Sequence, residues 1–348
     1  MNRPLLLAAL AVLTSCGPEP ALEAGQPLLA ESSDPGSAQD VPSTQDINDD
    51  LNGTSVILAV PTTSGGCELT TSMNGGPLPY GCSNNGPLLA STLAWVSLDS
   101  ITAPDGSAVD SASLQGTRFT GIVNGTRVSD EAFVGAQFNG TATDGSLVRL
   151  RLDSAEPGSD KQVDVWRYDF SYQNAKGEWK QLCTKGHKRA VVVSGRWDYH
   201  QGNPGDGRKL NDPTVFTIGC RRSAIEKCIN AGYKPWATAG GVSLDAYHQA
   251  CVRLMRADYC GDGVSHTIAG RQVDLYDRIG IQTDTKPWLR EAEWTAGGAR
   301  CVSSLNLTTA DASCVPILGT TSCGEMSSFS SDTLLISETP KAGGRDGR

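Results

Sequence analysis

The feature that most constrains the fold of this chain is a pair of helix-like segments that carry clustered cysteines. Residues 222–231 and 244–258 place apolar side chains at helical spacing, and Ser243 is positioned as the N-cap of the second segment. The connection between them is marked as a loop by Pro235, Gly240 and Gly241. We therefore expect the stretch to form a helical hairpin.

The spacing of the four cysteines predicts how they pair. In an antiparallel hairpin, residues whose numbers have a constant sum face each other, and the pairs Cys220–Cys260 and Cys228–Cys251 have nearly the same sum. If both segments are helical, the rise between the cysteines is roughly 12 Å in the first and roughly 13.5 Å in the second. We therefore expect two disulfides that staple the hairpin. The alternative is a four-cysteine zinc site, but this stretch lacks the Cys-x2-4-Cys spacing that such a site requires.

The second segment runs into the tetrapeptide Ala257-Asp258-Tyr259-Cys260. Further short motifs lie at Phe216–Cys220, Gly232–Trp236, His248–Cys251, Asp258–Gly263, Asp274–Asp277 and Glu293–Cys301. Together these motifs resemble the ADYC domain, a family named after that tetrapeptide, and the resemblance covers residues 111–305. It implies a secreted lipoprotein of the myxobacterial type in a family that has no assigned activity.

The N-terminus has the features of an export signal. Residues 1–15 contain the positive charge of Arg3 and an apolar run, Leu5–Leu13, that is too short to span a bilayer. Leu13-Thr14-Ser15-Cys16 looks like a lipobox, which implies cleavage before Cys16 and attachment to a membrane through acylation of this cysteine. The alternative is an ordinary cleaved signal followed by a chance cysteine. We expect a lipid-anchored protein of the cell envelope, with the outer membrane as the default location.

Residues 16–50 are predicted to form a disordered acidic tether. The segment after Cys16 has no lysine, arginine or aromatic residue, so it cannot bury enough apolar surface to fold. Its acidic residues are Glu19, Glu23, Glu31, Asp34, Asp40, Asp46, Asp49 and Asp50. Because they supply most of the formal net charge of -9, the folded body is nearly neutral. It lacks the basic excess of a protein that binds nucleic acid, so we exclude that partner.

The composition of the body predicts an α+β fold in which a β-rich part, a sandwich or a barrel-like sheet, carries the stapled hairpin. We divide it into an N-terminal β-rich region (51–110), the ADYC-like domain (111–305) and a region rich in cysteine and serine that ends in a frayed tail (306–348). The alternation in Leu147–Leu152 is typical of a half-buried strand.

One predicted strand, Val165–Tyr172, carries four aromatic residues on one face. They are Trp166, Tyr168, Phe170 and Tyr172. Such a face could be a platform for sugars, or it could fill the core beneath the hairpin. Trp197 and Tyr199 repeat the alternation further along the chain.

The count of eleven cysteines predicts a disulfide framework. If Cys16 is acylated, an even number remains, and export would place these cysteines in an oxidising compartment. Beyond the two hairpin bonds we expect short loops closed by Cys67–Cys82 and Cys314–Cys323. Cys183–Cys301 is then the remaining pair.

The titratable residues give little support for catalysis. The four histidines form no metal-type pair, and the chain has no Gly-x-Ser-x-Gly elbow and no P-loop. Asp198 and His200 could orient one another, and with His248 they are the weak candidates for a hydrolytic site. Asp258 and Asp262 flank a glycine turn, where they could bind calcium or only accept backbone N–H bonds.

These observations favour a non-enzymatic protein that binds a glycan or an envelope protein, or that has a structural role, and that needs no cofactor. The alternative is an exported hydrolase with an active site near Asp198, His200 and His248. A solvent-open cleft that brings these three residues together would favour the hydrolase. A shallow surface with exposed tryptophan and tyrosine would favour the binding protein.

Overall fold

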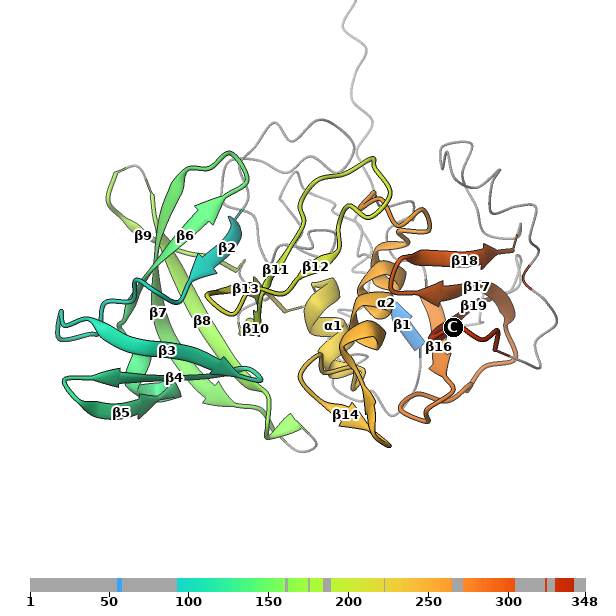
Figure 1. Ribbon diagram of the computed structural model, residues 1–348, viewed down its shortest axis with the longest axis horizontal. Coiled ribbons are helices and arrows are strands. Elements are labelled where there is room, and N and C mark those ends of the chain that lie inside the picture. Colours follow the sequence, from blue (N-terminus) through green and yellow to red (C-terminus); the bar gives the residue numbers. More distant parts are fainter. Residues whose placement is uncertain are drawn as a thin grey trace, which may run out of the picture. The chain divides into compact units, whose positions relative to one another are not determined.

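The computed structural model describes residues 55–57, 93–159, 162–174, 176–183, 189–221, 223–264, 272–303, 323 and 329–340. The predicted signal peptide, Cys16, the acidic tether, Cys67, Cys82 and Cys314 lie outside these residues. Within the described part of the chain, strands form five sheets and are joined by two α-helices, which confirms the expected α+β class (Figure 1). None of the helices described is long and apolar enough to cross a membrane.

The largest sheet has seven antiparallel strands in the order β10-β13-β2-β6-β7-β8-β9. Their bounds are β2 Leu93–Ser97, β6 Gln137–Ala142, β7 Leu147–Pro157, β8 Trp166–Gln173, β9 Trp179–Gln181, β10 Val191–Ser194 and β13 Val215–Gly219. The alternation that predicts a strand from Leu147 is confirmed, since Val148, Leu150 and Leu152 of β7 are buried.

The aromatic face of β8 fills a core and is not a sugar platform. Its four aromatic side chains are all buried. They pack with phenylalanines of other strands, among them Phe119, Phe138 and Phe216. This core lies between the seven-stranded sheet and a three-stranded sheet of β3 Val109–Gln115, β4 Arg118–Val123 and β5 Thr126–Ser129, which is followed by the 3-10 helix η2 Asp130–Phe133. The expected position beneath the helical hairpin is therefore wrong.

A five-stranded sheet in the order β1-β16-β19-β17-β18 supports the helices. Its strands are β1 Ser55–Ile57, β16 Gln272–Asp277, β17 Leu289–Thr295, β18 Gly298–Val302 and β19 Leu335–Thr339. The helix α2, Asp245–Arg256, packs against β17, β18 and β19. The apolar side chains of these elements form a second core with those of the helix α1, Ala224–Asn230.

Capping residues and a neighbouring strand pair set the ends of the two helices. Ser223 caps α1 because its hydroxyl accepts a hydrogen bond from the N–H of Glu226, and Gly232 follows the helix with a φ of +94°. Ser243 is not the N-cap of α2, since Leu244 takes that position. The reason is that Ser243 belongs to β15, Val242–Ser243, which pairs with β14, Thr238–Ala239.

The disulfides confirm one predicted pair and overturn three. Cys228–Cys251 links α1 to α2 as expected. Cys220 bonds to Cys183, and Cys301 bonds to Cys323, so the predicted pairs Cys220–Cys260, Cys183–Cys301 and Cys314–Cys323 are wrong. Cys260 is also disulfide-bonded, and its partner lies outside the described residues. The constant-sum rule fails for Cys220 because this residue follows β13 and precedes α1, so it is not on a helix.

Candidate binding site

The C-terminal end of α2 reverses the chain at Ala257. This residue caps the helix in the left-handed conformation with a φ of 50°, and its N–H donates to the carbonyls of Arg253 and Leu254. The N–H of Asp258 then donates to the same Arg253 carbonyl at 2.9 Å. The left-handed conformation is costly for a residue with a Cβ, so the surrounding contacts must stabilise it. We call residues 257–263 the motif turn.

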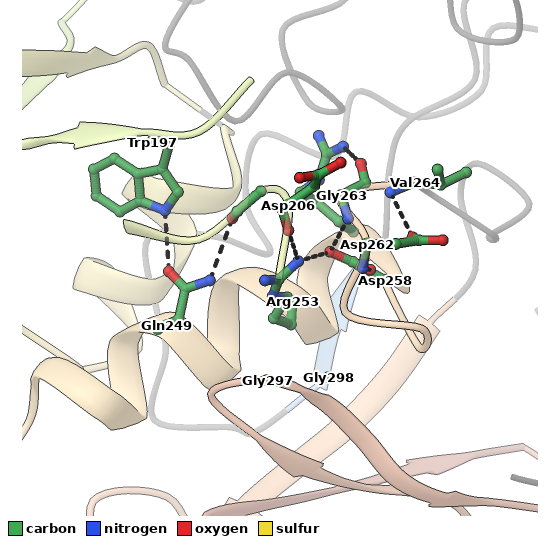
Figure 2. Close-up of polar contacts among 12 residues, drawn as sticks. Trp197, Asp206, Gln249, Arg253, Asp258, Asp262, Gly263, Val264, Gly297 and Gly298 are labelled. Atoms are coloured by element: carbon green, nitrogen blue, oxygen red, sulfur yellow. Dashed lines mark hydrogen bonds and ion pairs between the residues drawn. The ribbon is translucent and has the colours of Figure 1, made fainter. Parts of the chain in front are cut away.

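A buried ion pair holds the motif turn in this conformation. The guanidinium of Arg253 contacts the carboxylate of Asp258, and neither side chain reaches solvent. The same carboxylate accepts the backbone N–H groups of Asp262 and Gly263, each at 3.0 Å (Figure 2). Asp262 in turn accepts the N–H of Val264 at 3.0 Å. Both carboxylates thus accept backbone N–H bonds of the turn. This favours the role of turn caps over calcium binding for Asp258 and Asp262.

The motif turn also fixes the hairpin between β17 and β18. Tyr259 stacks on Trp294 with ring centroids 5.0 Å apart and donates its hydroxyl proton to Glu291 at 2.8 Å. Gly261 lies so close to Gly297 that a Cβ at this position would be 1.7 Å from the Gly297 carbonyl oxygen. Any side chain at Gly261 would therefore separate the turn from the hairpin.

The third element attached to the motif turn is the loop of residues 198–208, which joins β11, Arg196–Trp197, to β12, Lys209–Leu210. Backbone N–H groups of Gly202 and Gly205 donate to the carbonyls of Asp262 and Gly261 at 2.9 and 2.8 Å. The ion-paired Arg253 donates to the Asp206 carbonyl at 2.6 Å (Figure 2). We call this loop the β11–β12 loop.

Gln249 of α2 fastens the two ends of the β11–β12 loop. Its side-chain oxygen accepts from the indole N–H of Trp197 and from the N–H of Lys209, both at 3.2 Å, and its amide nitrogen donates to the Gly207 carbonyl at 3.3 Å. The helix, the motif turn and the loop therefore form one hydrogen-bonded unit, which Figure 2 shows from Trp197 to Val264.

The β11–β12 loop and the neighbouring strands present a row of stacked rings at the surface. Trp95 of β2 stacks on Tyr199 with centroids 6.4 Å apart, and Tyr199 stacks on His200 at 4.6 Å. The guanidinium of Arg196 lies over the Trp95 ring at 4.6 Å. The first two rings are half-buried, whereas the His200 side chain is 66% exposed. We call Trp95, Arg196, Tyr199 and His200 the aromatic ladder.

Of the three predicted catalytic residues, two meet and the third does not join them. The Nδ1 atom of His200 lies 2.6 Å from Oδ1 of Asp198. Burial raises the pKa of Asp198, but hydrogen bonds from His200 and the nearby positive charge of Arg208 outweigh it, so its pKa is lowered. This carboxylate is therefore ionised at neutral pH and serves to orient His200.

His248 is part of the core. It has no exposed surface, its Nδ1 donates to the Tyr233 carbonyl at 2.7 Å, and its ring makes a T-shaped contact with Trp197. Burial is the largest cause that lowers its pKa, to about 4, so the ring is neutral. The open cleft that a hydrolase would need around Asp198, His200 and His248 is not what the described residues form.

The sequence indicated part of the aromatic ladder. The alternation that contains Trp197 and Tyr199 pointed to this strand, although Trp197 faces the core and only Tyr199 the surface. Trp95 could not be assigned to the site from sequence, because it comes from β2, far away in the chain.

The comparisons with known proteins agree with the motif analysis. The sequence model described as the ADYC domain matches residues 130–308. No curated protein and no solved structure matches the chain significantly.

Replacement of Asp258 by asparagine should strongly destabilise the protein. Asparagine retains an oxygen that can accept backbone N–H bonds, but it leaves the Arg253 charge buried without its partner. We expect the free energy of unfolding, measured with urea, to fall by about 3–5 kcal/mol. Asp99→Asn removes the same charge from an exposed position and should change it little. A loss from Asp258→Asn as small as that of the control would contradict the role of the ion pair.

The buried neutral state of His248 predicts a loss of stability in acid. Its pKa in the folded protein is about 4, below its ordinary value of 6.5, so between these values the unfolded chain binds a proton that the folded chain does not. The free energy of unfolding should therefore decrease as the pH falls through this window, by roughly 3 kcal/mol from this residue. His248→Asn, which keeps a donor for the Tyr233 carbonyl, should show a shallower decrease in urea unfolding. Equal slopes for the wild type and His248→Asn would refute the assignment.

Proposed function

This chain belongs to the ADYC domain family, and from that membership and the site above we propose a lipid-anchored, non-enzymatic protein of the cell envelope that binds a glycan through the aromatic ladder. The observation that carries the proposal is the half-buried stack of Trp95 and Tyr199 on a hydrogen-bonded base.

The composition of the ladder suits a sugar. A pyranose ring has an apolar face of C–H groups and an edge of hydroxyl groups. Arg196 and His200 cover part of the Trp95 and Tyr199 rings, and the half-buried rings offer their remaining apolar surface, with the indole and phenol groups as polar atoms at its margin. Arg196, Asp198 and His200 place hydrogen-bonding groups beside the rings.

The disulfides support an envelope location. Cys183–Cys220, Cys228–Cys251 and Cys301–Cys323 are closed, and such bonds persist in oxidising compartments outside the cytoplasm. The lipobox-like sequence before Cys16 supplies the anchor, and the acidic tether after it would separate the body from the membrane surface.

The anchor is tested by replacing its attachment residue. Cys16→Ser should move the protein from the membrane fraction to the soluble fraction and abolish incorporation of a labelled fatty acid, because serine lacks the thiol to which the lipid would be attached. Ser15→Ala keeps a small residue before the cysteine and should remain membrane-bound and labelled. Labelling of Cys16→Ser at the wild-type level would refute the lipid anchor.

The glycan site is tested by co-sedimentation with insoluble polysaccharide and peptidoglycan isolated from a bacterial envelope. Trp95→Ala and Tyr199→Ala should each weaken binding about tenfold or more, because each removes a central ring of the ladder. The control is Trp179→Ala, which removes another half-buried tryptophan that is paired with a cation, Arg151, at 4.7 Å. It should bind like the wild type.

Two results would overturn this assignment. If the wild-type protein sediments with none of these fractions, the ladder is not a site for envelope glycans. If Trp179→Ala loses binding as much as Trp95→Ala does, while far-UV circular dichroism shows that both are folded, binding occurs elsewhere on the protein.

A further inference from the structure

Three carboxylates converge at the five-stranded sheet, far from the aromatic ladder in sequence. Asp274 of β16 and Glu338 of β19 are direct cross-strand partners, and Asp284 comes from the loop that follows β16. One oxygen from each of the three groups lies within 4.8 Å of the other two. We call these three residues the acidic cluster. In the described part of the chain it is the group of acidic, histidine and cysteine side chains placed to share a metal ion.

Hydrogen bonds to Asp274 fasten the loop that carries Asp284 to the strand β16. Asp274 accepts the backbone N–H groups of Thr285 and Lys286 at 3.1 and 3.2 Å, and it also contacts the Thr285 hydroxyl at 3.2 Å. Asp274 and Glu338 are fully buried, whereas Asp284 is exposed. The acidic cluster thus consists of two buried carboxylates and one that is exposed to solvent.

The second observation is a buried oxygen that is not satisfied. Glu338 accepts a hydrogen bond from the Tyr276 hydroxyl at 2.9 Å through Oε1, but its Oε2 is buried without a hydrogen-bond partner among the described residues. An ionised carboxylate in such a position has lost hydration without a replacement, which is strongly unfavourable. This oxygen needs either a proton or a cation.

The charged side chains around Glu338 do not supply a partner for its Oε2 atom. Asp274 and Asp284 place two further carboxylates beside it. Arg290, its cross-strand neighbour on β17, carries the opposite charge and donates a hydrogen bond to Glu293 at 2.8 Å. The basic side chain of Lys286 in the loop is exposed.

We propose that Asp274, Asp284 and Glu338 form a binding site for a hard divalent cation, and that Ca²⁺ is the ion that fits it. The ligand atoms are all carboxylate oxygens, without the nitrogen or sulfur that Zn²⁺ prefers. Ca²⁺ accepts about six to eight oxygen ligands in flexible geometry, and the exposed side at Asp284 leaves room for water among them. Mg²⁺ is less suited because it demands a near-ideal octahedron. A bound ion would satisfy Oε2 of Glu338 and join β16, β19 and the loop.

Calorimetric titration of the full-length protein, stripped with EDTA, with CaCl2 tests the site. We expect one Ca²⁺ per chain with a dissociation constant between roughly micromolar and millimolar, and a higher thermal unfolding midpoint with Ca²⁺ than with EDTA. Asp284→Asn should weaken binding about tenfold, because it removes one charged ligand from an exposed position without disturbing the core. Asp99→Asn, an equal change of charge on another exposed aspartate, should bind like the wild type.

Glu338→Gln separates cation binding from a merely structural role. Glutamine removes the buried negative charge and can donate to the neighbouring carboxylates, so with EDTA this variant should unfold at or above the temperature of the wild type. Its unfolding midpoint should no longer respond to CaCl2.

The proposal is overturned if the stripped wild type binds no Ca²⁺ at millimolar concentration, or if Asp284→Asn and Glu338→Gln bind it as tightly as the wild type. Tighter binding of Zn²⁺ than of Ca²⁺ would overturn the assignment to a hard cation. A higher midpoint for Glu338→Gln with EDTA, together with no effect of CaCl2 on the wild type, would show that the cluster shares a proton instead.

Discussion

The arrangement around α2 depends on one buried ion pair, Arg253 with Asp258. The same two side chains bind the Asp206 carbonyl and the N–H groups of Asp262 and Gly263, so they connect the helix, the motif turn and the β11–β12 loop. Because the desolvation of two buried charges largely cancels their attraction, such a pair adds little net stability. We infer that its main effect is to select this backbone arrangement, since any alternative that separates the charges leaves one of them buried and alone.

The backbone arrangement that the ion pair selects also determines the conformation of the β11–β12 loop, which carries part of the aromatic ladder. The β11–β12 loop contains Gly202, Gly205 and Gly207, all with positive φ, and such a loop would sample many conformations without attachment. The motif turn and Gln249 supply that attachment through backbone hydrogen bonds. These bonds hold the loop that carries Tyr199 and His200, and if the aromatic ladder binds a ligand as proposed, less entropy would be lost on binding. The motif that identifies the family thus has a structural role beneath the proposed site.

Local patterns in the sequence predicted local structure well. Helical spacing located both helices, and the alternation in β7 indicated its buried face. Cys228 and Cys251 could be paired correctly because both lie on helices, where the constant-sum rule applies. The other pairs failed because their partners come from strands and connections whose relative positions depend on sheet order, and sheet order cannot be derived from helical geometry.

Because sheet order cannot be derived from local sequence patterns, only some parts of the candidate sites could be predicted from the sequence. The motif turn could be singled out because its tetrapeptide and the neighbouring motifs resemble the ADYC domain, whereas its left-handed cap at Ala257 and its ion pair with Arg253 were not predicted. The acidic cluster has no such spacing: Asp274 and Glu338 are neighbours only because β19 inserts between β16 and β17 in the register that pairs them. Trp95 joins the aromatic ladder for a similar reason, since it reaches Tyr199 from a different strand. The densest motif in this chain therefore marks the support, whereas the residues that would contact ligands are scattered along the chain and are brought together only by the sheets.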